Sequence, residues 1–265
     1  MPTDPTETAV TNATHSVDAF HRGRFHLVQP RGGHRSGLDA LLLAAAVPSG
    51  FAGHAADLGA GAGAAGLAVL SRCPEAHLTL VERDPVMLDC ARLTLALTEN
   101  QHLASRAKIL DADVGLTGPA RIAAGLADAQ FDVALMNPPF NDPSDRVTPD
   151  ALRKAAHVMD DGLFEAWIRT AAAIVRPGGT LALIARPESL GDILTALGRR
   201  FGGPEIILVY PRPDQPAIRL ILRATKGSKA RPTFLPPLVL RDASGSQPTD
   251  RAQRLSDGLA ALYSD

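Results

Sequence analysis

The segment Ala55-Ala56-Asp57-Leu58-Gly59-Ala60-Gly61-Ala62-Gly63-Ala64-Ala65-Gly66 places a short apolar strand directly before a run of glycines. Glycines at the end of a strand allow a tight turn and a close approach of a nucleotide-like ligand to the backbone. Gly61, Gly63 and Gly66 also satisfy the G-x-G-x-x-G pattern of dinucleotide-binding proteins. That pattern is weak alone, because dense packing of Ala and Gly also produces it. The segment predicts a strand, a glycine turn and an apolar helix to about residue 70.

The remainder of the chain alternates strands and helices. Apolar runs predict strands at 77–81, 107–110, 131–136, 180–185 and 206–210, with helices at 40–47, 85–98, 163–175, 189–200 and 251–263. This alternation predicts a doubly wound, Rossmann-like α/β fold. Residues 218–224 follow a short Pro-rich loop, which favours an antiparallel hairpin with the strand before it. We expect a polar, disordered tail at 1–18 and one domain at 19–265 with a short basic and helical N-terminal extension.

Composition excludes several classes of protein. The 265 residues are 45% apolar and carry a formal net charge of −1, so a large core is expected and global electrostatics do not indicate nucleic acid. Two cysteines are too few for a disulfide scaffold or a cysteine-based zinc site, and no metal site is expected. No apolar run reaches the ~20 residues of a membrane span, and the start has no signal-peptide pattern. A cytoplasmic protein is the expectation.

Two acids follow predicted strands where a nucleotide would lie. Glu82 ends the second strand, 21 residues after Gly61, and an acid at this spacing can bind both ribose hydroxyls of an adenosine. Asp113 follows the third strand and can accept a hydrogen bond from an adenine amino group. Asp113 is equally compatible with an exposed loop carboxylate.

The run 131–136 ends abruptly in Asn137-Pro138-Pro139-Phe140. Two prolines stop a sheet ladder and hold the turn stiffly, which fixes the Asn137 amide and the Pro138 carbonyl in space. Two such acceptors can bind both N–H groups of an sp² amine and direct its lone pair at an electrophile, while Phe140 stacks on the ring or amide that carries it. A simple strand-ending turn is the alternative. The polar loop 141–150 beside it is either a lid or a connector.

The segment from Ala19 to Arg35 is basic and contains no acid. Arg22, Arg24, Arg31 and Arg35 form either a phosphate-contacting arm or a solvated lead-in to the first helix. Asp39 and Ser36 are candidates to cap that helix. A more specific alternative places Asp39 beside a bound cofactor.

The Asp57–Gly63 motif, Glu82, Asp113 and Asn137–Phe140 together resemble class I S-adenosylmethionine-dependent N-methyltransferases. Three further segments resemble the signatures of bacterial tRNA1(Val) adenine-37 N6-methyltransferases: the run Arg35–Ala44 near the amino terminus, then Lys226-Gly227 with Arg231-Pro232, and Leu235–Leu238. The matching segments are collinear from about residue 21 onward. The chain departs from that family at Phe140, where Tyr is common, and at Ala156-His157-Val158, where relatives often carry Arg-His-Glu.

The resemblance implies a seven-stranded, mostly parallel sheet with an antiparallel last strand. It implies S-adenosylmethionine as cofactor, with Asp57, Gly59, Gly61 and Gly63 at its methionine part, Glu82 at its ribose and Asp113 at its adenine. Asp39 would lie on the segment that covers the cofactor. Asn137, Pro138, Pro139 and Phe140 would hold the target adenine of an RNA, expected to be a tRNA. Two basic segments, 19–35 and 199–231, would contact the RNA backbone.

Other functions stay open. Release-factor methyltransferases, which modify a glutamine amide in protein, also use Asn-Pro-Pro-aromatic, and a carboxamide presents the same planar N–H pair. A small-molecule methyltransferase is a further alternative. An NAD-dependent oxidoreductase could use Gly61–Gly66, but it has no use for Asn137–Phe140. A non-enzymatic RNA-binding scaffold would not need the intact acids and glycines.

Overall fold

The computed structural model describes residues 14–32, 35–139 and 151–263, the last range with side chains from residue 162 onward. Its first element is an antiparallel hairpin of β1 (His15–Phe20) and β2 (Phe25–Pro30). The predicted tail is therefore wrong for residues 15–18, and the basic lead-in is a strand pair up to Pro30. The hairpin forms because β2 packs on the main body and buries Phe25 and Leu27 completely.

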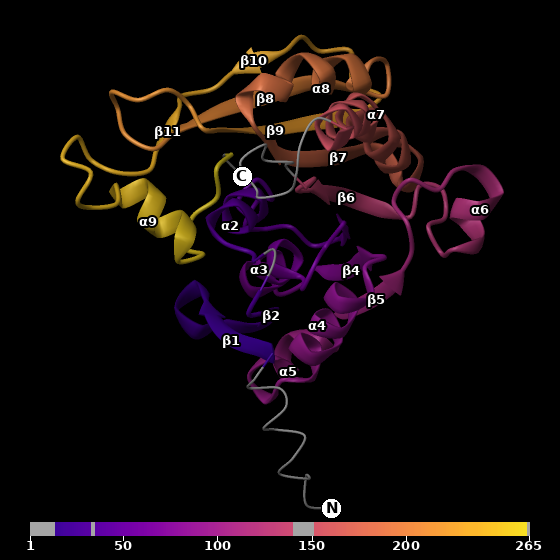
Figure 1. The fold of residues 1–265 in the computed structure, drawn as a ribbon, viewed down its shortest axis with the longest axis horizontal. Coiled ribbons are helices and arrows are strands. Elements are labelled where there is room, and N and C mark those ends of the chain that lie inside the picture. The colour runs from indigo at the N-terminus through magenta and orange to yellow at the C-terminus, as the bar shows by residue number, and fades with distance from the viewer. Residues whose placement is uncertain (1–13, 33–34, 140–150, 264–265) are drawn as a thin grey trace, which may run out of the picture.

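The described residues form a sheet of nine strands (Figure 1). Its order is β10-β8-β9-β7-β6-β3-β4-β5, and β11 also pairs with β8. The strands are β3 (His54–Leu58), β4 (His77–Glu82), β5 (Ala107–Asp111), β6 (Phe131–Met136), β7 (Val175–Ala185), β8 (Phe201–Tyr210), β9 (Arg219–Lys226), β10 (Thr233–Phe234) and β11 (Leu238–Val239).

The predicted seven-stranded arrangement is confirmed as the part of this sheet that runs from β8 to β5. Strand β9 is antiparallel to both neighbours, β7 and β8, while β3 to β7 pair in parallel. The short strands β10 and β11 extend the β8 edge in parallel.

Helices cover both faces of the sheet (Figure 1). Residues of α2, α3 and α9 share one hydrophobic cluster with β3, β6 and β7, while α7 and α8 share the other. The helices are α2 (Leu38–Ala44), α3 (Ala64–Arg72), α4 (Pro85–Ala96), α5 (Gln101–Ala104), α6 (Gly118–Ala123), α7 (Ala151–Ile174), α8 (Leu190–Leu197) and α9 (Asp250–Ser256). The final helix was predicted to reach residue 263, but it ends at Ser256.

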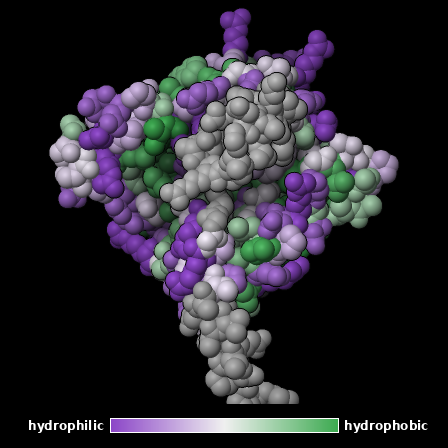
Figure 2. Space-filling model, in the orientation of Figure 1, coloured by the Kyte–Doolittle hydropathy of each residue, from purple (hydrophilic) through white to green (hydrophobic). Residues whose placement is uncertain are grey.

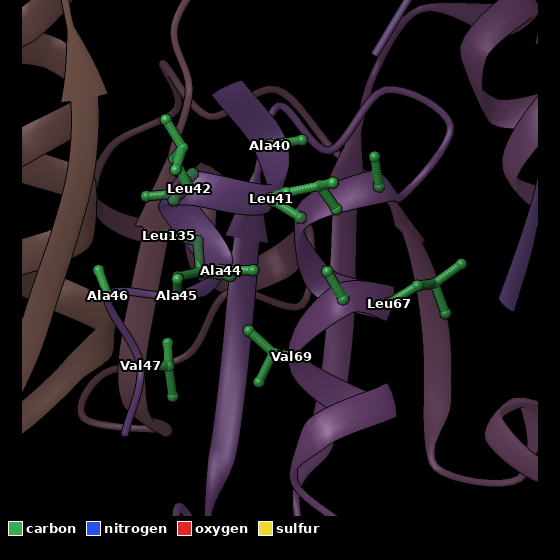
Figure 3. Packing of buried hydrophobic residues seen from close by; sticks show 14 of the residues in the cluster. Ala40, Leu41, Leu42, Ala44, Ala45, Ala46, Val47, Leu67, Val69 and Leu135 are labelled. Carbon is green, nitrogen blue, oxygen red and sulfur yellow. The ribbon is translucent and has the colours of Figure 1, made fainter. Parts of the chain in front are cut away.

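Helix α2 lies in the middle of the first layer. Figure 3 shows Leu41 on the side of α2 that faces α3 and Leu42 on the opposite side, and both belong to the same hydrophobic cluster as the α3 residues Leu67 and Val69. All five residues Ala40–Ala44 are buried, which is unusual for so short a helix. Such burial makes α2 a fixed internal element, and its first turn reaches the edge where the parallel strands end.

The last residues of the chain return to this layer. The backbone N–H of Leu262 donates to the carbonyl of Ala45, 2.8 Å away, just past the end of α2. The buried Tyr263 hydroxyl donates to the carbonyls of Glu205 and Ile221 at 3.1 and 3.3 Å. The C-terminal segment thus fastens α2 to β8 and β9.

Candidate active site

A cleft opens at the carboxyl ends of β3 and β6. Its walls come from the end of β2, the lead-in and first turn of α2, the glycine turn after β3, and the start of α4. The lining residues are Gln29, Pro30, Ser36, Ala40, Asp57, Gly59, Ala60, Gly61, Ala62, Ala64, Ala65, Met87 and Asn137. Ligands of open α/β sheets bind at this edge, where the strand order reverses, here between β3 and β6.

The glycine turn is held against the neighbouring strand. The N–H groups of Gly59 and Ala60 both donate to the carbonyl of Val81, at 2.9 and 3.0 Å. Gly61 has a φ of +57°, and a Cβ added there would meet nothing within 4 Å, because that position faces open space. Gly63 caps α3 with a φ of 97°. The turn therefore presents bare backbone to the cleft.

Asp57 is a buried acidic residue of the site. Its Oδ2 accepts a hydrogen bond from the N–H of Gly66 at 2.8 Å, and the residue is only 2% exposed. Burial raises its pKa to about 7, the Gly66 N–H opposes that rise, and the nearby Glu82 carboxylate adds to it. A cationic group of a ligand would stabilise the ionised form.

Glu82 joins β4 to the glycine turn. Its Oε2 accepts from the N–H of Gly61 at 2.8 Å, and its Oε1 accepts from the N–H groups of Arg83 and Asp84 at 2.7 and 2.9 Å. These bonds fix the carboxylate beside the glycine turn, and its binding of ribose hydroxyls stays a prediction.

These features fit S-adenosylmethionine. Its α-amino group and sulfonium are cationic and suit the buried Asp57, and its ribose hydroxyls suit Glu82. The open position at Gly61 leaves room for such a ligand against the backbone.

Two of the acids predicted to bind the cofactor are engaged elsewhere. Asp39 forms an ion pair with Arg219, with 2.8 Å between Oδ2 and Nε, and does not line the cleft, although Ser36 and Ala40 do. Asp113 pairs with Arg83 at 2.6 Å and accepts from the N–H of Gly115. Their roles toward the cofactor stay predictions.

The Asn-Pro-Pro corner follows β6 as predicted. Asn137 is half-buried and lines the same cleft as Asp57 and the glycine turn. Pro138 is buried and Pro139 exposed. Phe140 and the loop 141–150, considered above as a lid, lie outside the described residues.

All four arginines predicted to contact RNA make contacts within the protein. Arg22 pairs with Asp257 at 2.5 Å, Arg24 donates to the carbonyl of Gly258, and Arg35 pairs with Asp18 at 2.7 Å. Arg31 is exposed. The first two arginines tie the hairpin to the segment after α9, so their RNA contact stays a prediction.

The sequence analysis missed several residues of the site. Gln29, 2% exposed, donates to Asp18 and accepts from the N–H of Ser36 at 2.6 Å, which joins the hairpin to the lead-in of α2. Trp167 of α7 packs against Gly59. Met87 lines the cleft from α4. No local pattern marks them, because each reaches the site through tertiary packing.

Neither Ser36 nor Asp39 caps α2. Gly37 occupies the N-cap position and makes no side-chain cap bond.

Comparison with known proteins identifies the class. Residues 36–207 match the methyltransferase small domain family, and the chain belongs to that family. It is therefore an S-adenosylmethionine-dependent methyltransferase, as predicted. The chain is 28% identical over 238 residues to the tRNA1(Val) (adenine(37)-N6)-methyltransferase of Porphyromonas gingivalis, a match that covers 86% of this chain and 90% of that protein. The predicted family resemblance is confirmed.

Two further relatives differ in name. The crystal structure of a protein from Agrobacterium tumefaciens, described as a predicted O-methyltransferase, is 44% identical, has a TM-score of 0.75 and is covered to 99% by 86% of this chain. Ribosomal RNA small subunit methyltransferase C of Pseudomonas aeruginosa is 32% identical over 135 residues, which are 50% of this chain and 32% of that protein. Within the described residues, no helix is both long and apolar enough to cross a membrane.

Proposed function

We propose that this protein transfers a methyl group from S-adenosylmethionine to the exocyclic N6 of an adenine in RNA, specifically in a tRNA, in the cytoplasm. The observation that carries the proposal is the position of Asn137, which lines one cleft together with Asp57 and the glycine turn. An amide acceptor beside a cofactor cleft serves to bind an amino group. The similarity to the tRNA1(Val) adenine-37 enzyme along nearly its whole length supports the choice of acceptor.

The cofactor supplies a methyl group already activated by its sulfonium. The protein's contribution is position and orientation. The Asn137 side-chain oxygen and the Pro138 carbonyl accept from the two N–H groups of the target amine, and the prolines hold these acceptors rigidly. Phe140 stacks on the base. An adenine in a loop costs less to unstack than one in a helix, so a tRNA loop suits this site.

The choice of nitrogen over oxygen rests on what lines the cleft. A hydroxyl acceptor needs a base to remove its proton, whereas an amine loses its proton readily once alkylated. Among the described lining residues, Asp57 is the one titratable side chain, and its Oδ2 is bound to the Gly66 N–H. This cleft therefore suits an amine better than the oxygen named for the Agrobacterium tumefaciens relative.

Two exposed apolar side chains lie beside the Asp39–Arg219 ion pair in sequence. Leu38 is 38% exposed and precedes Asp39, and Ile218 is 41% exposed and precedes Arg219. Figure 2 shows apolar side chains gathered over the region between α2 and β11. Unstacked bases are commonly held by such surfaces.

The test is transfer of labelled methyl to total tRNA, total protein and small-molecule extract, followed by mass spectrometry of the nucleosides. We expect label in N6-methyladenosine from tRNA alone. Asn137→Ala should abolish transfer while S-adenosylhomocysteine binds as in the wild type, and Gln101→Ala, an exposed amide on α5, serves as the unaffected control. Label in protein would favour a glutamine amide, and full activity of the Asn137 variant would refute the mechanism.

A further inference from the structure

The start of α2 has no cap of its own. Gly37 at the N-cap offers no side chain, and the first turn closes with a 3.2 Å bond from the N–H of Ala40 to the carbonyl of Gly37. A helix of seven residues is too short to hold itself in place, so contacts with other elements must fix where it begins. Ser36 and Ala40 in this turn line the cleft, and whatever fixes the turn also fixes that wall.

Two contacts hold the turn from opposite sides. On the hairpin side, the buried Gln29 accepts from the N–H of Ser36 at 2.6 Å. On the sheet side, Arg219 at the start of β9 pairs with Asp39 at 2.8 Å across 180 positions of sequence. The Arg219 guanidinium also donates to the carbonyl of Ile218 at 2.8 Å, which limits its freedom to swing away.

The reversed direction of β9 explains why Arg219 is there. Arg219 lies opposite Val209, near the end of β8, and Leu220 lies opposite Ala185 at the end of β7. Because β9 runs opposite to β7 and β8, its first residue lies at the edge of the sheet where those two strands end. A parallel strand would bring its last residue there instead, as β6 brings Asn137 directly after Met136.

We infer that the Asp39–Arg219 ion pair is a positioning device for the cofactor cleft, and that Arg219 is a positioning residue for methyl transfer. The inference rests on the proposed cofactor site. Exposed ion pairs often contribute nothing measurable, but these two side chains are 26% and 29% exposed, and the residues around Asp39 form the cleft wall. Asp39 acts through the wall rather than by touching the cofactor.

The test is a double-mutant cycle read by calorimetric binding of S-adenosylhomocysteine. Asp39→Asn and Arg219→Gln should each weaken binding about tenfold, close to 1.4 kcal/mol. The double variant should be no weaker than the weaker single one, because each substitution breaks the same contact. In methyl transfer, KM for the cofactor should rise while kcat changes little, and Arg219→Lys should recover part of the affinity.

Arg200→Gln is the matched control. Arg200 forms a similarly half-buried ion pair with Glu165, away from the cleft lining, so its loss should lower the melting temperature and leave the affinity unchanged. Melting curves of all variants check that each is folded. Affinities within twofold of wild type in both single variants, or losses that multiply in the double variant, would overturn the positioning role. Failure of the wild type to bind S-adenosylhomocysteine would instead count against the proposed cofactor.

Discussion

The indole ring of Trp167 lies against Gly59, so close that a Cβ at residue 59 would collide with the ring's far edge. This contact joins α7 to the glycine turn that lines the cleft. Gly59 is therefore constrained from two directions, by its φ of +67° and by the indole. Since Trp167 is the only tryptophan in the chain, it is also a built-in probe of the site.

We predict that S-adenosylhomocysteine changes the fluorescence of Trp167, because the ligand would occupy the cleft on the other side of Gly59. A titration should show a saturable change in emission with the midpoint found by calorimetry. Trp167→Phe should bind the ligand without the signal. An unchanged spectrum in a protein that calorimetry shows to be saturated would contradict this arrangement.

Substitution of Gly61 should separate binding from stability. Gly61→Ala places a non-glycine residue at positive φ, which costs roughly 1–2 kcal/mol, and directs its methyl group into the open space of the cleft. Gly118 in α6 is a matched control, with a φ of +53° and an equally open Cβ position. Both variants should melt a few degrees early, and only Gly61→Ala should lose affinity for S-adenosylhomocysteine. Equal binding by the two would count against a ligand on the glycine turn.

Glu82 should determine how strongly the ribose hydroxyls contribute to binding. The wild type should prefer S-adenosylhomocysteine to its 2′-deoxy analogue, because Glu82 can accept from the hydroxyl. Glu82→Ala should bind both ligands alike and about tenfold more weakly than the wild type binds the natural ligand. Competitive calorimetry measures the ratio, with the exposed Glu75→Ala as control. A retained preference in the Glu82 variant would place the ribose elsewhere.

Asp57 should make cofactor binding depend on pH. Its folded pKa of about 7 lies above its ordinary value of 3.8, so the folded protein keeps a proton there that the unfolded chain has lost. Stability should therefore fall as pH rises from about 4 to 7. A cationic ligand favours the carboxylate, so affinity for S-adenosylhomocysteine should rise about tenfold from pH 6 to pH 8, with proton release. Asp57→Asn should flatten this profile, and a flat wild-type profile would exclude Asp57 as the partner of the amino group.

The hairpin arginines should affect stability more than RNA binding. Arg22→Ala leaves the buried Asp257 without its ion pair and should lower the melting temperature. It should not change the dependence of tRNA affinity on salt. Arg31→Ala should reduce the logarithmic salt slope by about one, as expected for a lost phosphate contact. Filter binding at several salt concentrations distinguishes the two, and a reduced slope for Arg22→Ala would restore that residue to the RNA-contacting arm.

The sequence predicted the elements that depend on local chemistry. The glycine turn, the alternation of strands and helices and the reversed strand β9 are all present. These features arise from residues close together in the chain. The Asn137 corner was predictable for the same reason, since β6 must end at the prolines.

The sequence could not predict contacts made over long separations. Strand β2 is held by Thr94 and Asn100, whose side chains accept from the N–H groups of Val28 and His26 at 2.9 Å. Without knowledge of that packing, the basic composition of residues 19–35 indicates a phosphate-contacting arm rather than a strand packed on the protein. Likewise, Asp39 has the composition of a helix cap or a cofactor ligand, and its pairing with Arg219 depends on the completed sheet.

The fastening of α2 by the last residues of the chain has a consequence for synthesis on the ribosome. Helix α2 is made early, whereas two residues that hold it are made late. Arg219 pairs with Asp39, and Leu262 donates to the carbonyl of Ala45. A nascent chain can complete the glycine turn long before the opposite wall of the cleft is secured. Cofactor capture should accordingly wait until translation has delivered residue 262, and a chain released prematurely would carry the motif without the activity.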